Sequence, residues 1–427
     1  MTPPWVSRVT SWGLAILLCY VAVVPHRYVE LGPEAVWLVR GMAWAPALVL
    51  CGLAALLVRS WDARAPIVSL AGIWVALGVA GAAGGEAPLL GLTRVAYYSV
   101  TGVLLSLLLI FSRPERRDLH LILRLGMVAS VAVALYGLFE FWTQSNPIYG
   151  SSFSVSNPRY AHFAQDVFGR RIRSTVGHPV YLGGFLSMML PIVLHTTLVG
   201  RGVARSMGAL GVGSLIVGLL LTFTRGAYAA AFVGLVVYLS GRATRQVLIV
   251  LAAVGLIASV TFSSNRVWET LAGRQTLRQL ENLRTDQRGV AYWQSTALLA
   301  ESPLLGIGSG HYRFLARRHQ DWNDTPDNMH LRLLAETGLA GYVVFAMICV
   351  SVFTHLRVSQ RRLQDPRDRD LSRAITAALV GALFDMVTCD ALYFPLTRVT
   401  FWLFVGCGIG LSQIHDTEAS GKRVVLV

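Results

Sequence analysis

Three arginines could bind an anionic group: Arg225 lies between two apolar runs, and Arg173 and Arg288 lie in the two long connections of the chain. An arginine at membrane depth, such as Arg225 between two apolar runs, is costly unless it faces protein, water or an anion. Its planar fork of donors can bind phosphate oxygens through two parallel hydrogen bonds. These positions therefore indicate either arginines that extend to the membrane surface or a binding site for an anionic group.

A second set of residues could move a proton. His330 and His311 carry imidazoles, whose ordinary pKa of about 6.5 suits proton transfer at neutral pH, and Asp327 could act as a base or orient an acceptor. Each of these residues could instead have a purely structural role. Asp327 directly precedes a helix, where it could cap the first turn, and His311 could be a hydrogen-bonding loop residue. Glu336 could be a catalytic carboxylate, but pairing with Arg332 is the stronger interpretation.

Membrane spans must position these residues. Of the 427 residues, 54% are apolar and 14% are charged, and the mean hydropathy is +0.55, which a single soluble core could not bury. About twelve apolar runs have the roughly 17–25 residues that cross a bilayer as a helix. Their extents are 10–25, 38–58, 66–84, 95–112, 121–142, 178–199, 206–223, 226–240, 245–263, 333–355, 371–390 and 395–412. We therefore predict an all-α polytopic membrane protein whose first run is retained.

The arginines predict the orientation of the chain. The net charge of +14 rests on arginine, since Lys422 is the only lysine, and no compact basic domain remains to hold nucleic acid. Alternate short loops hold Arg59 and Arg64; Arg113, Arg116 and Arg117; Arg201 and Arg205; Arg242 and Arg245; and Arg357, Arg361, Arg362, Arg367, Arg369 and Arg373. The short loops on the other side hold little more than Arg27, Arg94 and Arg225. This asymmetry predicts that both termini are cytoplasmic.

Two connections, 143–177 and 264–327, are too long to be turns, and both are external in this topology. They contain many charges and aromatic side chains, so we expect folded structure on the outer face, with the chemistry there. The predicted organisation is a bundle of nine spans (1–263), an external loop region (264–327), three further spans (328–412) and a cytoplasmic tail (413–427).

Four sequence blocks occur in an order that resembles a known family. The first, RIRSTVGHPVYLGGFLSMMLPI, contains Arg173, and the second, LLLTFTRGAYAAAFVGLVV, contains Arg225. The third, DQRGVAYWQSTALLAESPLLGIGSGHYRF, has Arg288 and Tyr292 at i and i+4, on one face of a helix, followed by 303–308 as Pro-Leu-Leu-Gly-Ile-Gly. The fourth is TPDNMHLRLLAETGLAGYVVF. Together they resemble the O-antigen ligase and polymerase family.

The resemblance implies a bundle like that of the GT-C membrane glycosyltransferases, in a bacterial inner membrane, with a large periplasmic loop before the tenth span. It implies transfer of glycan from a polyprenyl-pyrophosphate donor to a hydroxyl on a glycan or lipid acceptor, without metal or cofactor. Arg173, Arg225 and Arg288 would then clamp the pyrophosphate. Whether the reaction is ligation or polymerisation stays open, and a transporter for the lipid-linked oligosaccharide is the alternative from another class.

The fourth block departs from the family pattern at one position. Where the family has a histidine before the asparagine, this sequence has Asp327 before Asn328. The base role that the resemblance implies therefore passes to Asp327 or to His330, which occupies the family's tyrosine position. Asn328, Tyr292 and His311 are predicted to contact the substrate.

Overall fold

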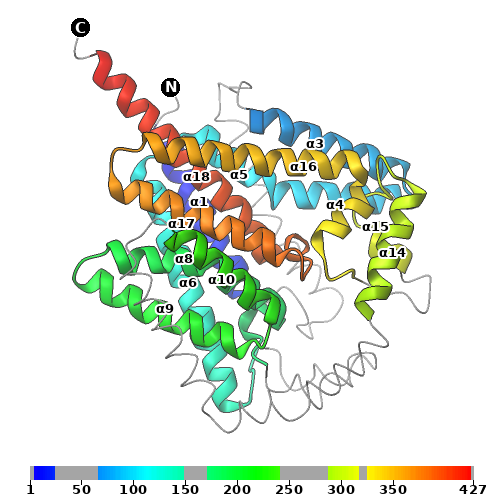
Figure 1. The fold of residues 1–427 in the computed structure, drawn as a ribbon, viewed down its shortest axis with the longest axis horizontal. Helices are drawn as coiled ribbons and strands as arrows, with labels where there is room; N and C mark the ends of the chain where they lie inside the picture. The colour runs from blue at the N-terminus through cyan, green and yellow to red at the C-terminus, as the bar shows by residue number, and fades with distance from the viewer. Residues whose placement is uncertain (1–3, 25–65, 149–170, 241–286, 317–324, 425–427) are drawn as a thin grey trace.

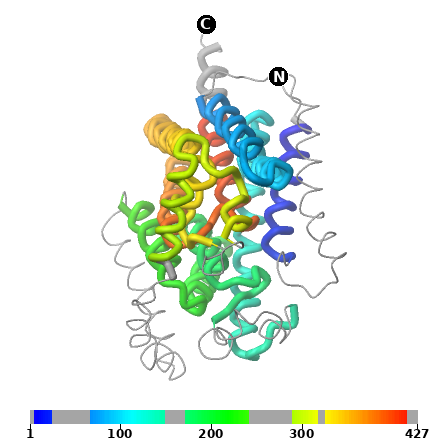
Figure 2. Tube along the Cα trace, turned by 90° about the vertical axis from the view of Figure 1, so that its right-hand side faces the viewer, coloured from blue at the N-terminus to red at the C-terminus, as the bar shows by residue number. Residues whose placement is uncertain are grey.

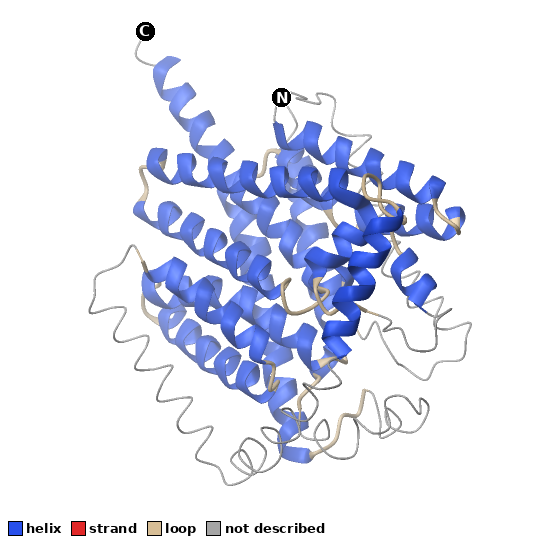
Figure 3. Ribbon diagram, turned by 45° about the vertical axis from the view of Figure 1, so that its right-hand side comes forward, coloured by secondary structure: helices blue, strands red, loops and turns tan. Residues whose placement is uncertain are grey.

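The computed structural model describes residues 4–24, 66–148, 171–240, 287–316 and 325–424, and every element within these ranges is helical (Figure 3). Among these residues, eight helices are long and apolar enough to cross a membrane: Trp5–Val23, Pro66–Gly84, Pro88–Ser112, Arg116–Thr143, Pro179–Val199, Val203–Leu221, Met329–Arg362 and Pro395–Ile414. The chain is therefore an all-helical, multi-pass membrane protein. The predicted spans 38–58 and 245–263 lie outside the described residues.

Helices from distant parts of the chain pack together in Figure 1. The first half contains α1 (Pro4–Val23), α3 (Pro66–Gly84), α4 (Pro88–Val100), α5 (Val103–Ser112), α6 (Arg116–Thr143), the short η3 (Ser174–Val176), α8 (Pro179–Val199), α9 (Val203–Leu221) and α10 (Arg225–Leu239). The second half contains α14 (Gln287–Glu301), α15 (His311–Ala316), α16 (Met329–Arg362), α17 (Pro366–Asp385), the short η4 (Ala391–Tyr393) and α18 (Pro395–Val424). Helix α16 lies beside α3, and α17 lies beside α8 and α10.

The helix boundaries differ from the prediction in two informative places. Within the expected span 95–112 the helix is interrupted at Gly102, which has φ of −135° and ψ of −109°. A Cβ there would lie 2.4 Å from the Tyr98 carbonyl oxygen and 3.1 Å from the Trp402 ring, so only glycine fits. The final helix, α18, continues to Val424, so the predicted tail 413–427 begins as helix. The external region 264–327 contains two helices, α14 and α15, among its described residues.

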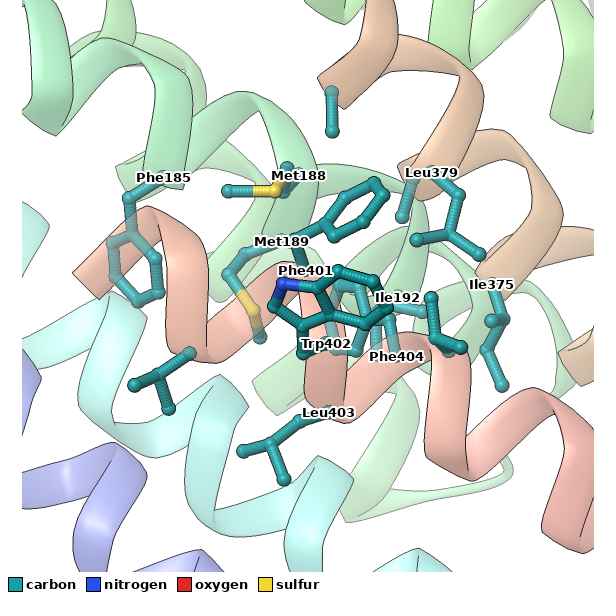
Figure 4. Packing of buried hydrophobic residues seen from close by; sticks show 14 of the residues in the cluster. Phe185, Met188, Met189, Ile192, Ile375, Leu379, Phe401, Trp402, Leu403 and Phe404 are labelled. Carbon is teal, nitrogen blue, oxygen red and sulfur yellow. The ribbon is translucent and has the colours of Figure 1, made fainter. Parts of the chain in front are cut away.

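The core of the bundle is formed by α8, α17 and α18. The residues of α8 from Pro179 to His195 are nearly all buried, which is the pattern of a helix with apolar side chains on every face. Figure 4 shows aromatic side chains of α18, including Trp402, between the methionines of α8 and the aliphatic side chains of α17. Helix α10 approaches α17 closely because Gly381 has no side chain. A Cβ at that position would lie only 2.9 Å from the Ala230 carbonyl oxygen.

Helix α16 is broken near its first third, and the loop 303–308 fills the break. Gly338 has φ of 64° and ψ of −174°, which interrupts the helical ladder. In an unbroken helix the amides of Leu339 and Ala340 would donate to the carbonyls of Ala335 and Glu336. Here both pairs bond to the loop: Ile307 N to Ala335 O at 2.9 Å, Gly308 N to Glu336 O at 3.0 Å, Leu339 N to Pro303 O at 2.8 Å, and Ala340 N to Leu304 O at 3.1 Å.

Glycines make this docking possible, since there is no room for a Cβ at either side of the contact. A Cβ on Gly306 would lie 2.4 Å from the Gly338 amide nitrogen, and one on Gly338 would lie 2.3 Å from the Leu304 carbonyl oxygen. Both glycines also have positive φ, of 73° and 64°. The Pro-Leu-Leu-Gly-Ile-Gly and Glu-x-Gly signatures are therefore the two halves of one backbone contact.

We predict that Gly306→Ala lowers the free energy of unfolding by about 2 kcal/mol or more, through the clash at Gly338 and the cost of a left-handed alanine. The matched control is Gly72→Ala in α3, where a Cβ would have no atom within 4 Å. It should leave the unfolding temperature in detergent unchanged or slightly raised, because alanine favours helix more than glycine. Equal unfolding temperatures for the two variants would contradict this account of the loop.

Candidate functional site

Several helices meet at one end of the bundle, which we call the site end. There α17 leads into α18 through residues 386–394, which we call the α17–α18 connection. The Met329 amide, at the start of α16, donates to the Met386 carbonyl at 2.7 Å. Tyr181 of α8 stacks on Phe394 with ring centroids 4.5 Å apart. Figure 2, viewed from the right-hand side of Figure 1, shows α14 and α15 over this end.

Arg173 lies at the site end, where Glu140 of α6 holds it. The amides of Arg173 and Ser174 donate to Glu140 Oε2 at 2.9 and 2.6 Å, and Arg173 Nε lies 3.5 Å from Oε1. A neighbour that the sequence analysis passed over, Arg171, donates to the Thr222 carbonyl at 2.7 Å and to Thr224 Oγ1 at 2.8 Å. The segment before α8 is thus joined to both α6 and the turn between α9 and α10.

Arg225 is the first residue of α10, and its side chain is exposed. The helix start is pressed against the α17–α18 connection, because a Cβ on Gly226 would overlap Thr388, with Oγ1 only 2.0 Å away. The tight turn expected between the two spans is present, with Phe223 at φ of 48°. The structure therefore holds the start of α10, with Arg225 as its first residue, against the α17–α18 connection at the site end.

The residues before α16 divide into a cap and an exposed acid. Asn328, not Asp327, caps the helix: its Oδ1 accepts hydrogen bonds from the amides of His330 at 3.0 Å and Leu331 at 3.1 Å. The idea that Asp327 caps the helix is therefore wrong. Asp327 is exposed, has φ of 47°, and accepts a hydrogen bond from Thr325 Oγ1 at 3.1 Å.

His330 is held through both ring nitrogens. Nε2 lies 3.2 Å from the Leu383 carbonyl, and Nδ1 lies 3.3 Å from the Tyr342 hydroxyl. A carbonyl can only accept, so Nε2 carries the proton and Nδ1 accepts from Tyr342. The lone pair that a general base needs is thus already used within the protein.

His311 is buried at the start of α15. Its Nε2 accepts a hydrogen bond from the Ala87 amide at 3.0 Å, in the turn between α3 and α4. Gly91 leaves room for the ring, since a Cβ there would lie 2.7 Å from the imidazole. His311 therefore joins α15 to the α3–α4 turn, in keeping with the hydrogen-bonding interpretation.

Helix α14 contains both residues that the third block singled out. Arg288 is its second residue, Tyr292 lies one turn later, and the Tyr292 side chain is exposed. The side-chain position of Arg288 lies outside the described part of the chain. The predicted i, i+4 arrangement within one helix is present.

A buried ionic cluster lies below the start of α16. Arg332 Nε donates to Glu336 Oε1 at 3.1 Å, which confirms the predicted pairing, and Arg332 Nη1 donates to Asp390 Oδ2 at 2.6 Å. The guanidinium carbon lies 3.8 Å from the centre of the Tyr393 ring. Arg332 is 1% exposed, so the two carboxylates compensate a charge that is almost wholly removed from water. The sequence analysis missed Asp390, because it lies 58 residues from Arg332 in the chain.

Burial raises the pKa of Asp390 to about 6; the field of Asp327 adds to the rise, whereas Arg332 opposes it. Asp390 lies in the α17–α18 connection, between the helices, and is 1% exposed. Asp390 therefore links the buried cluster electrostatically to the exposed acid Asp327.

Comparisons with known proteins agree with the sequence blocks. Residues 210–346 match a family model described as O-antigen ligase, so the match contains the second, third and fourth blocks and confirms the resemblance. No curated protein matches the chain. A chain from a solved structure, described as "Structural coordination of polymerization and crosslinking by a peptidoglycan synthase complex", aligns over 82% of this chain and 97% of its own. The sequence identity is 20% and the TM-score is 0.45.

We predict that Asp390 makes stability depend on pH. Because the folded protein binds a proton at Asp390 more tightly than the unfolded chain does, the free energy of unfolding should fall as the pH rises from about 4 to about 6. The contribution is about 3 kcal/mol, and no further change from this group is expected above that range. Unfolding in detergent across this interval should show a shallower slope in Asp390→Asn than in the wild type. An unchanged slope would contradict the assignment; Glu301→Gln, at an exposed helix end, is the control.

Proposed function

We propose that this chain, which carries the O-antigen ligase domain in residues 210–346, transfers glycan from a polyprenyl-pyrophosphate donor to a hydroxyl acceptor at the site end. The family match carries the proposal, because its residues include the start of α10, helix α14 and the start of α16. The charge asymmetry of the loops supports a periplasmic site end, an inner-membrane location and cytoplasmic termini.

Arginines would stabilise the departing lipid pyrophosphate. Transfer breaks the bond between the anomeric carbon and the phosphate oxygen, whose electron pair leaves with the pyrophosphate. Arg225, exposed at the start of α10, meets the requirement for a guanidinium that can contact it. Arg173, backed by Glu140, and Arg288, on α14, complete the proposed clamp. Their contacts strengthen as negative charge develops on the leaving oxygen.

Asp327 is the better of the two candidate bases. The acceptor hydroxyl forms the new bond to the anomeric carbon and gives its proton to the base. Asp327 is exposed beside the helix start, whereas both ring nitrogens of His330 are engaged by Leu383 and Tyr342. The exposed ring of Tyr292 can stack on a sugar. Asn328 caps α16 and His311 joins α15 to Ala87, so these two residues position the helices of the site.

The reaction can be tested with purified protein in detergent, polyprenyl-pyrophosphate oligosaccharide and candidate acceptors, in the presence of EDTA. We expect release of lipid pyrophosphate, since no step of the proposed reaction uses a metal. A ladder of longer lipid-linked glycan would identify a polymerase, and a single transfer to another acceptor would identify a ligase. Translocation of intact donor across reconstituted vesicles, without pyrophosphate release, would replace the proposal by a transporter.

Substitutions of exposed arginines at the site end and at the opposite end of the bundle should differ in their effect on the rate of pyrophosphate release. We predict that Arg225→Ala slows pyrophosphate release about 100-fold, because a guanidinium that stabilises the leaving group is lost. Arg201→Ala, which removes an exposed arginine between α8 and α9, should leave the rate unchanged. Equal effects of the two substitutions would count against the clamp.

Replacing the proposed base should change how the rate depends on pH. Asp327→Asn keeps the size of the side chain but cannot accept the acceptor's proton, so we predict a rate about 100-fold lower, without the rise with pH seen in the wild type. The matched variant His330→Gln should retain that rise. If His330→Gln loses the rise of the rate with pH while Asp327→Asn keeps it, His330 is the general base and the assignment to Asp327 is wrong.

A further inference from the structure

A pocket lies among α3, α4, α16 and α18, next to the α17–α18 connection. It has about 630 Å³ of space between its side chains, part of it open to solvent. Its walls include Trp74, Tyr98, Arg332 and Arg398, and also Glu336, whose carboxylate is paired with Arg332. The residues proposed to act in glycan transfer, Arg173, Arg225, Arg288 and Asp327, do not line it among the described residues. The pocket is therefore a separate feature of the bundle.

Four polar groups of these walls are buried without a hydrogen-bond partner among the described residues. They are Trp74 Nε1, Tyr98 Oη, Arg332 Nη2 and Arg398 Nη2. An indole N–H and a guanidinium N–H can only donate, and a phenol can donate. Buried polar groups are almost always hydrogen-bonded, so four unpaired donors in one pocket indicate a missing acceptor.

Arg398 is the buried cation of this pocket that lacks a counter-charge among the described residues. It is 1% exposed, and its donors contact neutral groups: Nε bonds to Thr101 Oγ1 at 2.9 Å, and Nη1 bonds to two carbonyls of the α17–α18 connection at 2.9 and 3.1 Å. The rings of Tyr97 and Tyr98 lie 4.6 and 4.8 Å from its guanidinium carbon. No carboxylate of the described residues lies within 4 Å of it, whereas Arg332 has two. A buried charge without a counter-charge is strongly unfavourable.

The tyrosine beside the pocket reports the local electrostatic potential. Tyr393 lines the pocket and lies in η4, outside the spanning helices. Burial alone would raise the pKa of its phenol, but the fields of Arg332, Arg94 and Arg313 hold that pKa below its ordinary value. The positive charge around the pocket therefore outweighs the effect of burial.

We propose that this pocket binds a phosphate-sized oxyanion, which accepts hydrogen bonds from Arg398, Arg332, Tyr98 and Trp74. Phosphate suits this set because it offers several oxygens to donors arriving from four helices, and because guanidinium groups bind it well. The phosphate could be free or could be the headgroup of a lipid. None of the four donors takes part in the glycan transfer proposed above, and Arg332 connects the pocket to the buried ion pair with Glu336 and Asp390.

The test is phosphate binding to the full-length protein in detergent, measured by calorimetry and by the rise in unfolding temperature with inorganic phosphate. Tyr98→Phe removes one donor that has no other partner, so it should fold normally and weaken binding about ten-fold. The matched control is Tyr97→Phe, the adjacent residue, which does not line the pocket and should bind as the wild type does. Arg398→Met should abolish phosphate binding. If the Arg398→Met variant does not fold, the comparison of Tyr98→Phe with the wild type tests the proposal.

A second arm identifies the source of the phosphate. In nanodiscs, phosphatidic acid that competes with inorganic phosphate in the wild type, but not in Tyr98→Phe, would indicate a lipid headgroup; binding of inorganic phosphate without such competition would indicate a free anion. Either result supports the site. The proposal is overturned if inorganic phosphate does not raise the unfolding temperature, or raises it equally in the wild type and Tyr98→Phe.

Discussion

The docking of the loop 303–308 into the break of α16 is the constraint on which the rest of the site end depends. Four backbone hydrogen bonds replace those lost where Gly338 interrupts the helix. In a membrane, unpaired backbone groups cost several kcal/mol each, so the break can exist only with the loop in place. The loop in turn fixes α15 and the end of α14, which flank it in the chain.

The break also sets the position of the charged groups below the helix start. Glu336, whose carbonyl accepts from the loop, holds Arg332 one turn earlier, and Arg332 reaches Asp390 of the α17–α18 connection. Asn328 caps this first turn, and Asp327 is the residue directly before it. A backbone contact, a buried ion pair and the exposed residues proposed for chemistry therefore lie along three turns of one helix.

The sequence predicted what depends on local pattern. Apolar runs indicated the helices, and the glycine signatures indicated the segments that approach closely, because both follow from residues near in the chain. Sequence did not predict Asp390 and Arg398, since their partners lie far away: Arg398 bonds to Thr101, 297 residues earlier. Nor did it predict the interruption at Gly102, whose close neighbour Trp402 lies 300 residues later in the chain. The alternative in which Asp327 caps the helix was one residue early, because Asp and Asn both favour that position and Asn328 is the cap.

Hydrogen exchange of the two segments that meet at the break tests the central claim most directly. The claim is that the loop 303–308 and residues 335–340 form one structural unit. Mass spectrometry of peptides covering both should show slow exchange of the amides of Ile307, Gly308, Leu339 and Ala340, with the two segments opening together as denaturant is added. If residues 303–308 exchange as fast as an exposed loop while residues 335–340 stay protected, α16 does not depend on the loop and the account is wrong.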